Sequence, residues 1–416
     1  MTPITPLLQA TQQAAVAVRQ LSDAQKTALL NRLSAVLTEN TALILAENQK
    51  DLDLMPDHTD PKYDRLQLTE ARLTDLARSL REVAMLPDPA GAVLLERTIQ
   101  PGLHLKKIAV PLGVVGVIYE SRPNVTVDVA ALCLRSGNAC VLKGGKEADY
   151  SNRVLVGLIQ RVLTEFGVPV AAVTLLPPDR AVVTELLTAT RYVDIIIPRG
   201  SDALIQFVRQ NSLVPTIETG AGVVHIYVEQ TADLEKARDI VVNAKVSRPS
   251  VCNALDCVLI DKAIADTLVP MLLADFLKWG VEVFADEVSH HLFSLARYPY
   301  LQRARPDDFG REFLDYKCAV KVVSGLDDAL SHIQTYSSRH SEAILSQNQP
   351  LIDRFLSEVD AAAVYANAST RFTDGPMFGL GAEIGISTQK LHARGPFALE
   401  KLVTEKWIVV GDGHVR

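Results

Sequence analysis

The sequence predicts an α/β protein with a doubly wound parallel sheet, a second α/β unit and a small β arm. Between residues 112 and 230, short apolar runs alternate with helical stretches, which is typical of parallel sheets. A second alternating series begins near Thr231. Residues 96–111 alternate around a Pro-Gly pair, as the two strands of a hairpin do.

Helices are expected to precede the first sheet. Residues 4–50 carry apolar positions at helical spacing, and Ser22 and Asp23 offer a cap for the stretch that follows them. A further helix fits Leu66 to Met85. The strands of the first sheet are then expected at 114–119, 139–143, 173–176, 193–197 and 223–228.

The second series starts with a helix over residues 233–245, a strand at 255–260 and a helix over 264–279. Strands at 319–323, 343–346 and 361–365 follow. A strand near the C-terminus is remote from this order, and we expect it to join the early hairpin in a sheet between subunits of a homo-oligomer. The expected domains are 1–95 with 112–230 and part of 366–400, then 231–365, and an arm of 96–111 with 401–416.

The composition indicates an ordinary globular protein. The chain has 416 residues, of which 48% are hydrophobic and 22% charged, so two or three domains are expected. A net charge of −7 gives no sign of the basic surface that binding to nucleic acid or an anionic membrane requires. The N-terminus lacks a signal-peptide pattern, and the longest apolar run, Ile108 to Tyr119, is too short to span a bilayer. We therefore expect a cytoplasmic protein.

Five cysteines without a pairing pattern favour a reducing compartment and argue against a disulfide framework. Cys133, Cys140 and Cys257 lie in apolar contexts, where a packed thiol is expected. His332 and His340 are not at metal-ligand spacing with a Cys or Asp cluster. We predict no metal site, and expect a helix-surface histidine and a loop histidine at these two positions.

Cys252 is the candidate nucleophile. The small-residue turn 248–254 opens a strand, so its thiol would be held on a tight bend. Glu218 lies upstream, in the segment IETGAG. A cysteine taken without context is most often a packed core residue, but the surrounding motifs outweigh that interpretation.

Two glycine-containing turns, 143–148 and 197–205, each follow a predicted strand and precede a predicted helix. Their backbone N–H groups could face a phosphate, although a glycine at such a turn more often serves only the turn. Ser201 is also an ordinary N-cap. Asn124 follows a strand and a proline, which suits donation to an oxyanion; a turn or N-cap asparagine is the alternative.

The order of these residues resembles the aldehyde dehydrogenase superfamily. Asn124 corresponds to its oxyanion Asn, Lys143 to its cofactor Lys, and Gly200 with Ser201 to its pyrophosphate turn. Further along the chain, Glu218 corresponds to its acidic residue, Cys252 to its nucleophile and Glu312 to its ribose-binding Glu. The segments that resemble the γ-glutamyl phosphate reductase family, also called glutamate-5-semialdehyde dehydrogenases, are 117–148, 248–260, 367–375 and 381–396. The resemblance covers essentially the whole chain.

The resemblance implies reduction of L-glutamyl 5-phosphate by NADPH to L-glutamate 5-semialdehyde with release of phosphate, a step of proline biosynthesis. Cys252 would form a thioester, and Asn124 with the Cys252 N–H would bind the oxyanion. Glu218 would serve in proton handling or electrostatics, because a reductive enzyme must keep its thioester from water. A glutamate 5-kinase is an expected neighbour.

Further residues are assigned by their place in these motifs. Gly145 and Lys146 stand where NAD-preferring relatives often carry a carboxylate, which favours NADPH, although Glu147 is adjacent. Guanidinium groups suit both the carboxylate and the phosphate of the substrate. The candidate arginines, each of which alone is more often a solvated or structural charge, are Arg122, Arg248, Arg371 and Arg394.

Three alternatives are weighed against this function. A hydrolytic NAD(P)-dependent aldehyde dehydrogenase differs in not depending on phosphate. A non-catalytic binding or scaffold subunit is disfavoured by the intact set of Asn124, Cys252 and Glu312. A cysteine protease is excluded because no His-containing segment matches a known Cys–His pairing.

Overall fold

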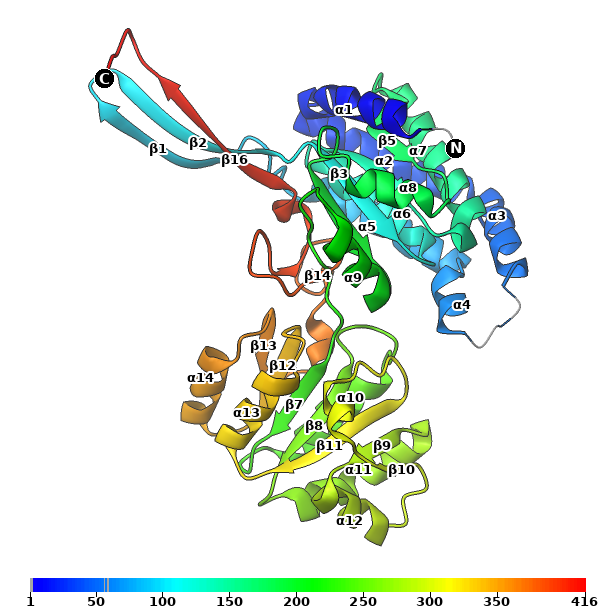
Figure 1. The fold of residues 1–416 in the computed structure, drawn as a ribbon, viewed down its shortest axis with the longest axis vertical. Coiled ribbons are helices and arrows are strands. Elements are labelled where there is room, and N and C mark those ends of the chain that lie inside the picture. Colours follow the sequence, from blue (N-terminus) through cyan, green and yellow to red (C-terminus); the bar gives the residue numbers. More distant parts are fainter. Residues whose placement is uncertain (1–2, 56, 58–59) are drawn as a thin grey trace. The chain divides into compact units, whose positions relative to one another are not determined.

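The computed structural model of the protein describes residues 3–55, 57 and 60–416. The chain divides into two compact units, each with a sheet and helices around it (Figure 1). Unit 1 comprises Met1–Thr219, Gly379–Gly385 and Pro396–Arg416, and unit 2 comprises Gly220–Phe378 and Ile386–Gly395.

The main sheet of unit 1 is parallel, with the order β5-β4-β3-β6. Its strands are β3 (Val114–Tyr119), β4 (Ala139–Lys143), β5 (Val173–Leu175) and β6 (Ile195–Arg199). Every residue of β3 and β4 is buried, because helices cover both faces of such a sheet. This explains why these strands are continuous apolar runs instead of alternating ones.

The helices of unit 1 are α1 (Thr5–Gln20), α2 (Asp23–Glu39), α3 (Thr41–Asp53), α4 (Pro61–Leu66), α5 (Glu70–Met85), α6 (Pro123–Arg135), α7 (Asp149–Glu165), α8 (Ala181–Leu187) and α9 (Asp202–Asn211). Ser22 caps α2 in a capping box with Gln25, as the sequence predicts. The helix predicted from Leu66 begins instead at Glu70, because the Thr69 hydroxyl accepts the Arg72 N–H and defines the N-terminus.

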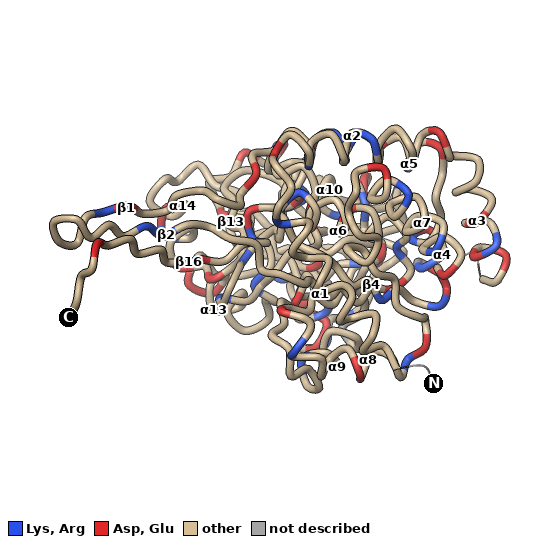
Figure 2. Tube along the Cα trace, turned by 90° about the horizontal axis from the view of Figure 1, so that it is seen from above, with Lys and Arg blue, Asp and Glu red and all other residues tan. Residues whose placement is uncertain are grey.

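The arm of unit 1 is an antiparallel sheet of β1 (Val93–Gln100), β2 (Leu103–Pro111) and β16 (Val403–Val410). The hairpin turns at Gly102, whose φ of +80° favours glycine. Both signs of charge lie along β1 and β2 (Figure 2), and Lys106 pairs with Glu96 across the strands at 2.9 Å. The predicted hairpin and the predicted late strand are therefore one sheet.

Unit 2 holds a seven-stranded parallel sheet with the order β10-β9-β11-β8-β7-β12-β13. Its strands are β7 (Val224–Val228), β8 (Leu255–Asp261), β9 (Glu282–Ala285), β10 (Leu301–Arg303), β11 (Lys317–Val323), β12 (Ser341–Leu345) and β13 (Ala363–Ala366). Its helices are α10 (Leu234–Val246), α11 (Ala265–Trp279), α12 (Glu287–Leu295), α13 (Leu326–Tyr336) and α14 (Gln349–Glu358). Two short strands, β14 (Ile386–Ser387) and β15 (Gly395–Pro396), complete the described strands. The predicted α/β class is confirmed, and among the described helices none has the length and apolarity to cross a membrane.

The prediction for His332 is wrong. This residue lies on α13 but is buried, with 3% of its surface exposed, because the helix turns that face toward the sheet. His340 lies outside the helices and strands, as expected, yet it is fully buried beside Ser341, whose Oγ is 2.8 Å from Nδ1.

Candidate active site

Cys252 lies in a turn between α10 and β8 of unit 2. It is partly exposed, whereas Cys133, Cys140, Cys257 and Cys318 are buried. The turn is held close to Gly222, where an added Cβ would lie 1.5 Å from the Cys252 carbonyl oxygen. Only glycine fits there, so the backbone of the IETGAG segment fixes the position of the thiol.

Glu312 also contacts Gly222, the glycine against which the Cys252 turn packs. Its Oε1 accepts the Gly222 N–H at 2.9 Å. The next residue, Phe313, donates its N–H to the buried Asp256 at 3.0 Å, and Asp256 also accepts the Val224 N–H at 3.4 Å. Burial raises the pKa of Asp256 to about 7. The structure thus brings Glu312 and Cys252 together around one glycine.

Two of the predicted arginines lie beside the cysteine turn. Arg371 donates through Nε to Ser247 at 3.1 Å and through Nη1 to the side chain of Asn253. Burial lowers its pKa and the charge of Arg248 lowers it further, while the negative charges of Asp374 and then of Cys252 act in the opposite direction. Arg371 and Arg248 therefore place positive charge where a Cys252 thiolate would form, which favours the reactive form of the thiol.

Arg394, also in unit 2, is part of a different cluster. Its Nη1 lies 2.6 Å from Asp360, which also pairs with Lys390 at 2.9 Å. These hydrogen bonds lower the pKa of Asp360 to about 2. The contacts of Arg394 are those of an ion pair near the C-terminal end of unit 2.

Asn124 lies in the first turn of α6 in unit 1, directly after Pro123. Its side chain is exposed, and Nδ2 donates to Oδ2 of Asp128 at 3.1 Å, one helical turn later. Burial raises the pKa of Asp128 to about 6, although the Asn124 hydrogen bond and the charge of Arg199 lower it. Arg122 is the N-cap residue of α6, so the N-cap alternative for Asn124 does not hold.

Lys143 ends β4 with 5% of its surface exposed. Its Nζ donates to the carbonyls of Gly144 at 2.9 Å and Pro178 at 3.3 Å. Burial lowers its pKa, and the nearby carboxylate of Glu147 acts against this shift. An ammonium held in this way can present its remaining N–H to a ligand.

In the rest of the KGGKEA turn, the Glu147 carboxylate is hydrogen-bonded within the protein, whereas the Lys146 side chain is exposed. Glu147 accepts both the N–H and the hydroxyl of Ser121 at 2.8 Å. A Cβ at Gly145 would lie 2.2 Å from the Glu147 carboxylate, so a larger residue there would displace that side chain. Lys146 is exposed.

The turn at Gly200 and Ser201 holds a carboxylate that the sequence analysis missed. Ser201 caps α9, and its own N–H donates to Oε2 of Glu120 at 2.9 Å. A Cβ at Gly200 would approach that oxygen to 2.5 Å. A helix N-terminus attracts anions, and Glu120 is the anion at this one. The motif YESRP contained Glu120, but nothing in the sequence indicated this contact.

Glu218 is also in unit 1, near its boundary at Thr219. Its side chain is 15% exposed and pairs with Nε of Arg209 at 3.4 Å.

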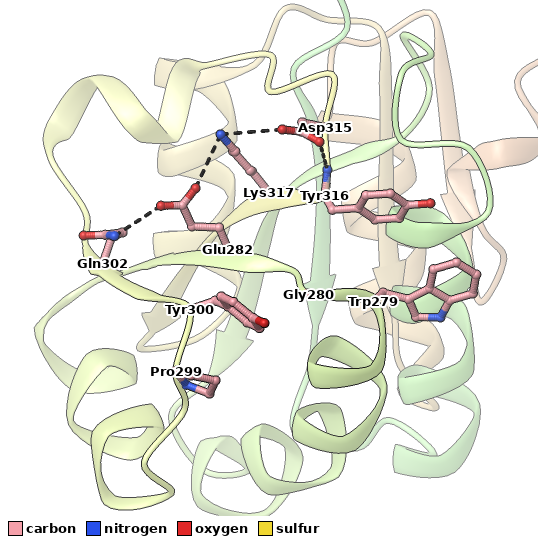
Figure 3. Close-up of a pocket in the computed structure, with 9 residues that line it drawn as sticks. All are labelled: Trp279, Gly280, Glu282, Pro299, Tyr300, Gln302, Asp315, Tyr316 and Lys317. Atoms are coloured by element: carbon pink, nitrogen blue, oxygen red, sulfur yellow. Dashed lines mark hydrogen bonds and ion pairs between the residues drawn. The ribbon is translucent and has the colours of Figure 1, made fainter. Parts of the chain in front are cut away.

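A pocket of about 450 Å³ in unit 2 involves none of the predicted site residues (Figure 3). Tyr316 stacks on Trp279, with ring centroids 5.8 Å apart. Lys317 lies between Glu282 at 3.4 Å and Asp315 at 3.5 Å. Because two carboxylates offset a single ammonium, the pocket is a poor match for an anionic acyl phosphate.

Comparisons with known proteins agree along the whole chain. The model of the aldehyde dehydrogenase family matches residues 4–289. A γ-glutamyl phosphate reductase of Chlorobaculum parvum is 53% identical over 98% of this chain and 97% of its own length. One from Legionella pneumophila is 51% identical over 100% and 99%.

Solved structures give the same result. The crystal structure of γ-glutamyl phosphate reductase from Thermotoga maritima is 40% identical, covers 100% of both chains and has a TM-score of 0.93. An acetylating aldehyde dehydrogenase from Geobacillus thermoglucosidasius, 14% identical with a TM-score of 0.74 over 99% of this chain and 97% of its own, shares the fold. The chain belongs to the γ-glutamyl phosphate reductase family of the aldehyde dehydrogenase superfamily.

Proposed function

We propose that the protein reduces L-glutamyl 5-phosphate to L-glutamate 5-semialdehyde with NADPH and releases phosphate, the second step of proline biosynthesis from glutamate. The observation that carries the proposal is the partly exposed Cys252, held on a turn by Gly222 with Arg371 beside it, in a chain about half identical to relatives named for this reaction. A glutamate 5-kinase would supply the labile acyl phosphate.

In the proposed mechanism the Cys252 thiolate attacks the acyl carbon, a C–S bond forms, and the C–O bond to phosphate breaks. A nicotinamide cofactor, when bound, would supply the hydride that reduces the thioester. Asn124 and the Cys252 N–H donate to the oxyanion of each tetrahedral intermediate. When the reduced intermediate collapses, the C–S bond breaks, and the aldehyde and the free thiol are formed.

A nicotinamide cofactor fits the residues of unit 1. The Ser201 N–H at the start of α9 already binds a carboxylate, and a phosphate oxygen would accept the same hydrogen bond once Glu120 withdrew. Lys143 offers a buried ammonium at the end of β4 in the same sheet. In unit 2, the Glu312 carboxylate would accept from a ribose hydroxyl.

We assign the choice of NADPH to Lys146. Its exposed ammonium can meet a 2′-phosphate, while Glu147 is bound to Ser121 and does not compete for that position. Lys146→Ala should weaken NADPH binding about 10-fold, or ~1.4 kcal/mol, and leave NADH binding nearly unchanged. Fluorescence titration with both cofactors measures this, with the exposed Lys62→Ala as control. Equal losses for the two cofactors would place selectivity elsewhere.

Asp128 should give the reaction a pH dependence through Asn124. Above its pKa of about 6 the ionised carboxylate accepts the Asn124 amide N–H, and protonation weakens this hold. We expect kcat to fall as the pH drops through about 6, and the corresponding ionisation to be absent from Asp128→Asn. Identical pH profiles of kcat for the two proteins would show that Asp128 does not orient Asn124.

One assay distinguishes the proposed reductase from the alternative, a hydrolytic aldehyde dehydrogenase. NADP⁺ reduction by glutamate 5-semialdehyde is followed with and without phosphate. Phosphate is the acyl acceptor in the reverse of the proposed reaction, so turnover should depend on it. Steady turnover without phosphate would mean that water takes the acyl group and that Glu218 is a candidate for its activation.

We propose that the arm of β1, β2 and β16 joins subunits of a homo-oligomer. The two outer strands, β1 and β16, are exposed along most of their length, including Val93, Ile99, Trp407 and Val409. Sheets with apolar residues exposed in this way are typical of subunit contacts. Trp407→Glu should break this contact, so that light scattering gives a molar mass in solution that corresponds to a smaller assembly. An unchanged mass would place the subunit contact on another surface.

A further inference from the structure

Three metal-ligating side chains converge inside unit 2, and none of them is assigned to the proposed reaction. They are His225 on β7, Cys257 on the adjacent β8 and His332 on α13, and one ligand atom of each lies within 4.8 Å of the others. His225 and Cys257 are register partners of parallel strands. All three are buried, at 0%, 0% and 3% exposure.

The spacing suits coordination. Sγ of Cys257 lies 3.7 Å from Nε2 of His332. Tetrahedral zinc with Zn–S of about 2.3 Å and Zn–N of about 2.0–2.1 Å places such atoms ~3.6 Å apart. The distance between this pair already matches, and the His225 nitrogen, within 4.8 Å of the other two ligand atoms, needs to approach by ~1.4 Å at most.

The orientation of His225 is the second observation that points to a ligand. Its Nδ1 is 3.1 Å from Oε2 of Glu342, while its buried Nε2 makes no hydrogen bond of standard geometry among the described residues and has the Cys257 thiol as its interacting neighbour. Glu342 also accepts the His225 backbone N–H at 2.9 Å and the Ser337 hydroxyl. A carboxylate that fixes one imidazole nitrogen and leaves the other toward a metal is the usual support of zinc-binding histidines.

We propose that His225 Nε2, Cys257 Sγ and His332 Nε2 form a buried zinc site that ties β7, β8 and α13 together. Two imidazoles and a thiolate are ligands that zinc prefers. The ion displaces the proton of the Cys257 thiol, and each neutral imidazole coordinates through its unprotonated Nε2 while its ring proton stays on Nδ1. Its two positive charges are balanced by the Cys257 thiolate and the Glu342 carboxylate, so the buried cluster becomes neutral.

Lys321 competes with the metal in this arrangement. Its Nζ lies 3.1 Å from Nδ1 of His332 and, by donating there, leaves the ring proton on Nε2. Zinc binding moves that proton to Nδ1 and requires the ammonium to turn away. Lys321 is 28% exposed and already lies 4.0 Å from Asp328, which can receive it. Removing this ammonium should therefore strengthen metal binding.

The test uses the full chain in a Cys252→Ala background, which removes the one partly exposed thiol among the described residues. The protein is loaded with zinc chloride alone, freed of excess metal by gel filtration and analysed by elemental mass spectrometry. We expect stoichiometric zinc in this background and in the added control Cys318→Ala, another buried thiol of the same sheet. The metal should be lost when Cys257→Ala or His332→Gln is added.

Two further variants separate a metal site from a hydrogen-bonded core. Lys321→Met should tighten zinc binding about 10-fold, and Glu342→Gln should weaken it about 10- to 100-fold, the effects expected of residues behind the ligands. Cobalt in place of zinc should show thiolate charge-transfer absorption that Cys257→Ser removes. Absence of zinc from both the background and Lys321→Met, or its retention in a folded Cys257→Ala, would overturn the proposal.

Discussion

Cys252→Ala is expected to abolish both directions of the reaction, by about 10³-fold or more, while NADPH binding stays nearly intact. The substitution removes the covalent step, and the proposed cofactor contacts come from other residues. Turnover measured in the reductive and phosphate-dependent oxidative directions checks the loss, and fluorescence titration checks the cofactor. Retained turnover above about a thousandth of wild type would exclude Cys252 as the nucleophile.

Cys318→Ala is the matched control, because Cys318 is a fully buried thiol of the same unit. Burial raises the pKa of Cys318 to about 12 and raises that of Cys133 as well, so both stay protonated near neutral pH. Iodoacetamide should therefore label the partly exposed Cys252 first, as mass mapping of the peptides will show. Faster labelling of Cys140 or Cys257 would contradict this expectation.

Asn124→Ala should lower kcat by roughly two to three orders of magnitude with little change in KM or in stability. This is the usual loss when one oxyanion donor is removed, and it falls on kcat because the donor acts in the transition state. The exposed position of Asn124 on α6 makes an effect on the free energy of unfolding small.

Asn211→Ala, at the exposed end of α9, is the control for removing an asparagine amide from a helix of unit 1. Steady-state kinetics and thermal unfolding of both variants give the comparison. If kcat of Asn124→Ala fell less than about threefold, the amide would serve only its hydrogen bond to Asp128, a contact worth a few tenths of a kcal/mol on a helix surface.

The sequence alone determined the α/β class, most elements and the family. Periodicity, caps and turns act over a few residues, so Ser22, the Pro-Gly turn of the arm and the bend at Cys252 could be predicted from their neighbours. The order of the motif residues was sufficient to indicate the family, because that order is itself a property of the chain.

The tertiary structure decided which residues distant in the sequence contact one another. Three contacts join residues that lie 26 or more positions apart in the sequence. They are Gly222 against the Cys252 carbonyl, the Glu120 carboxylate at the Ser201 N–H, and the Glu147 carboxylate at Ser121.

Burial belongs to the same class of fact. His332 has the spacing of a surface helix residue, yet it lies beside Cys257 in the core, because the neighbours that cover a helix face come from distant strands. The raised pKa of Asp128 has the same origin, since desolvation depends on everything packed around a group and not on the sequence beside it.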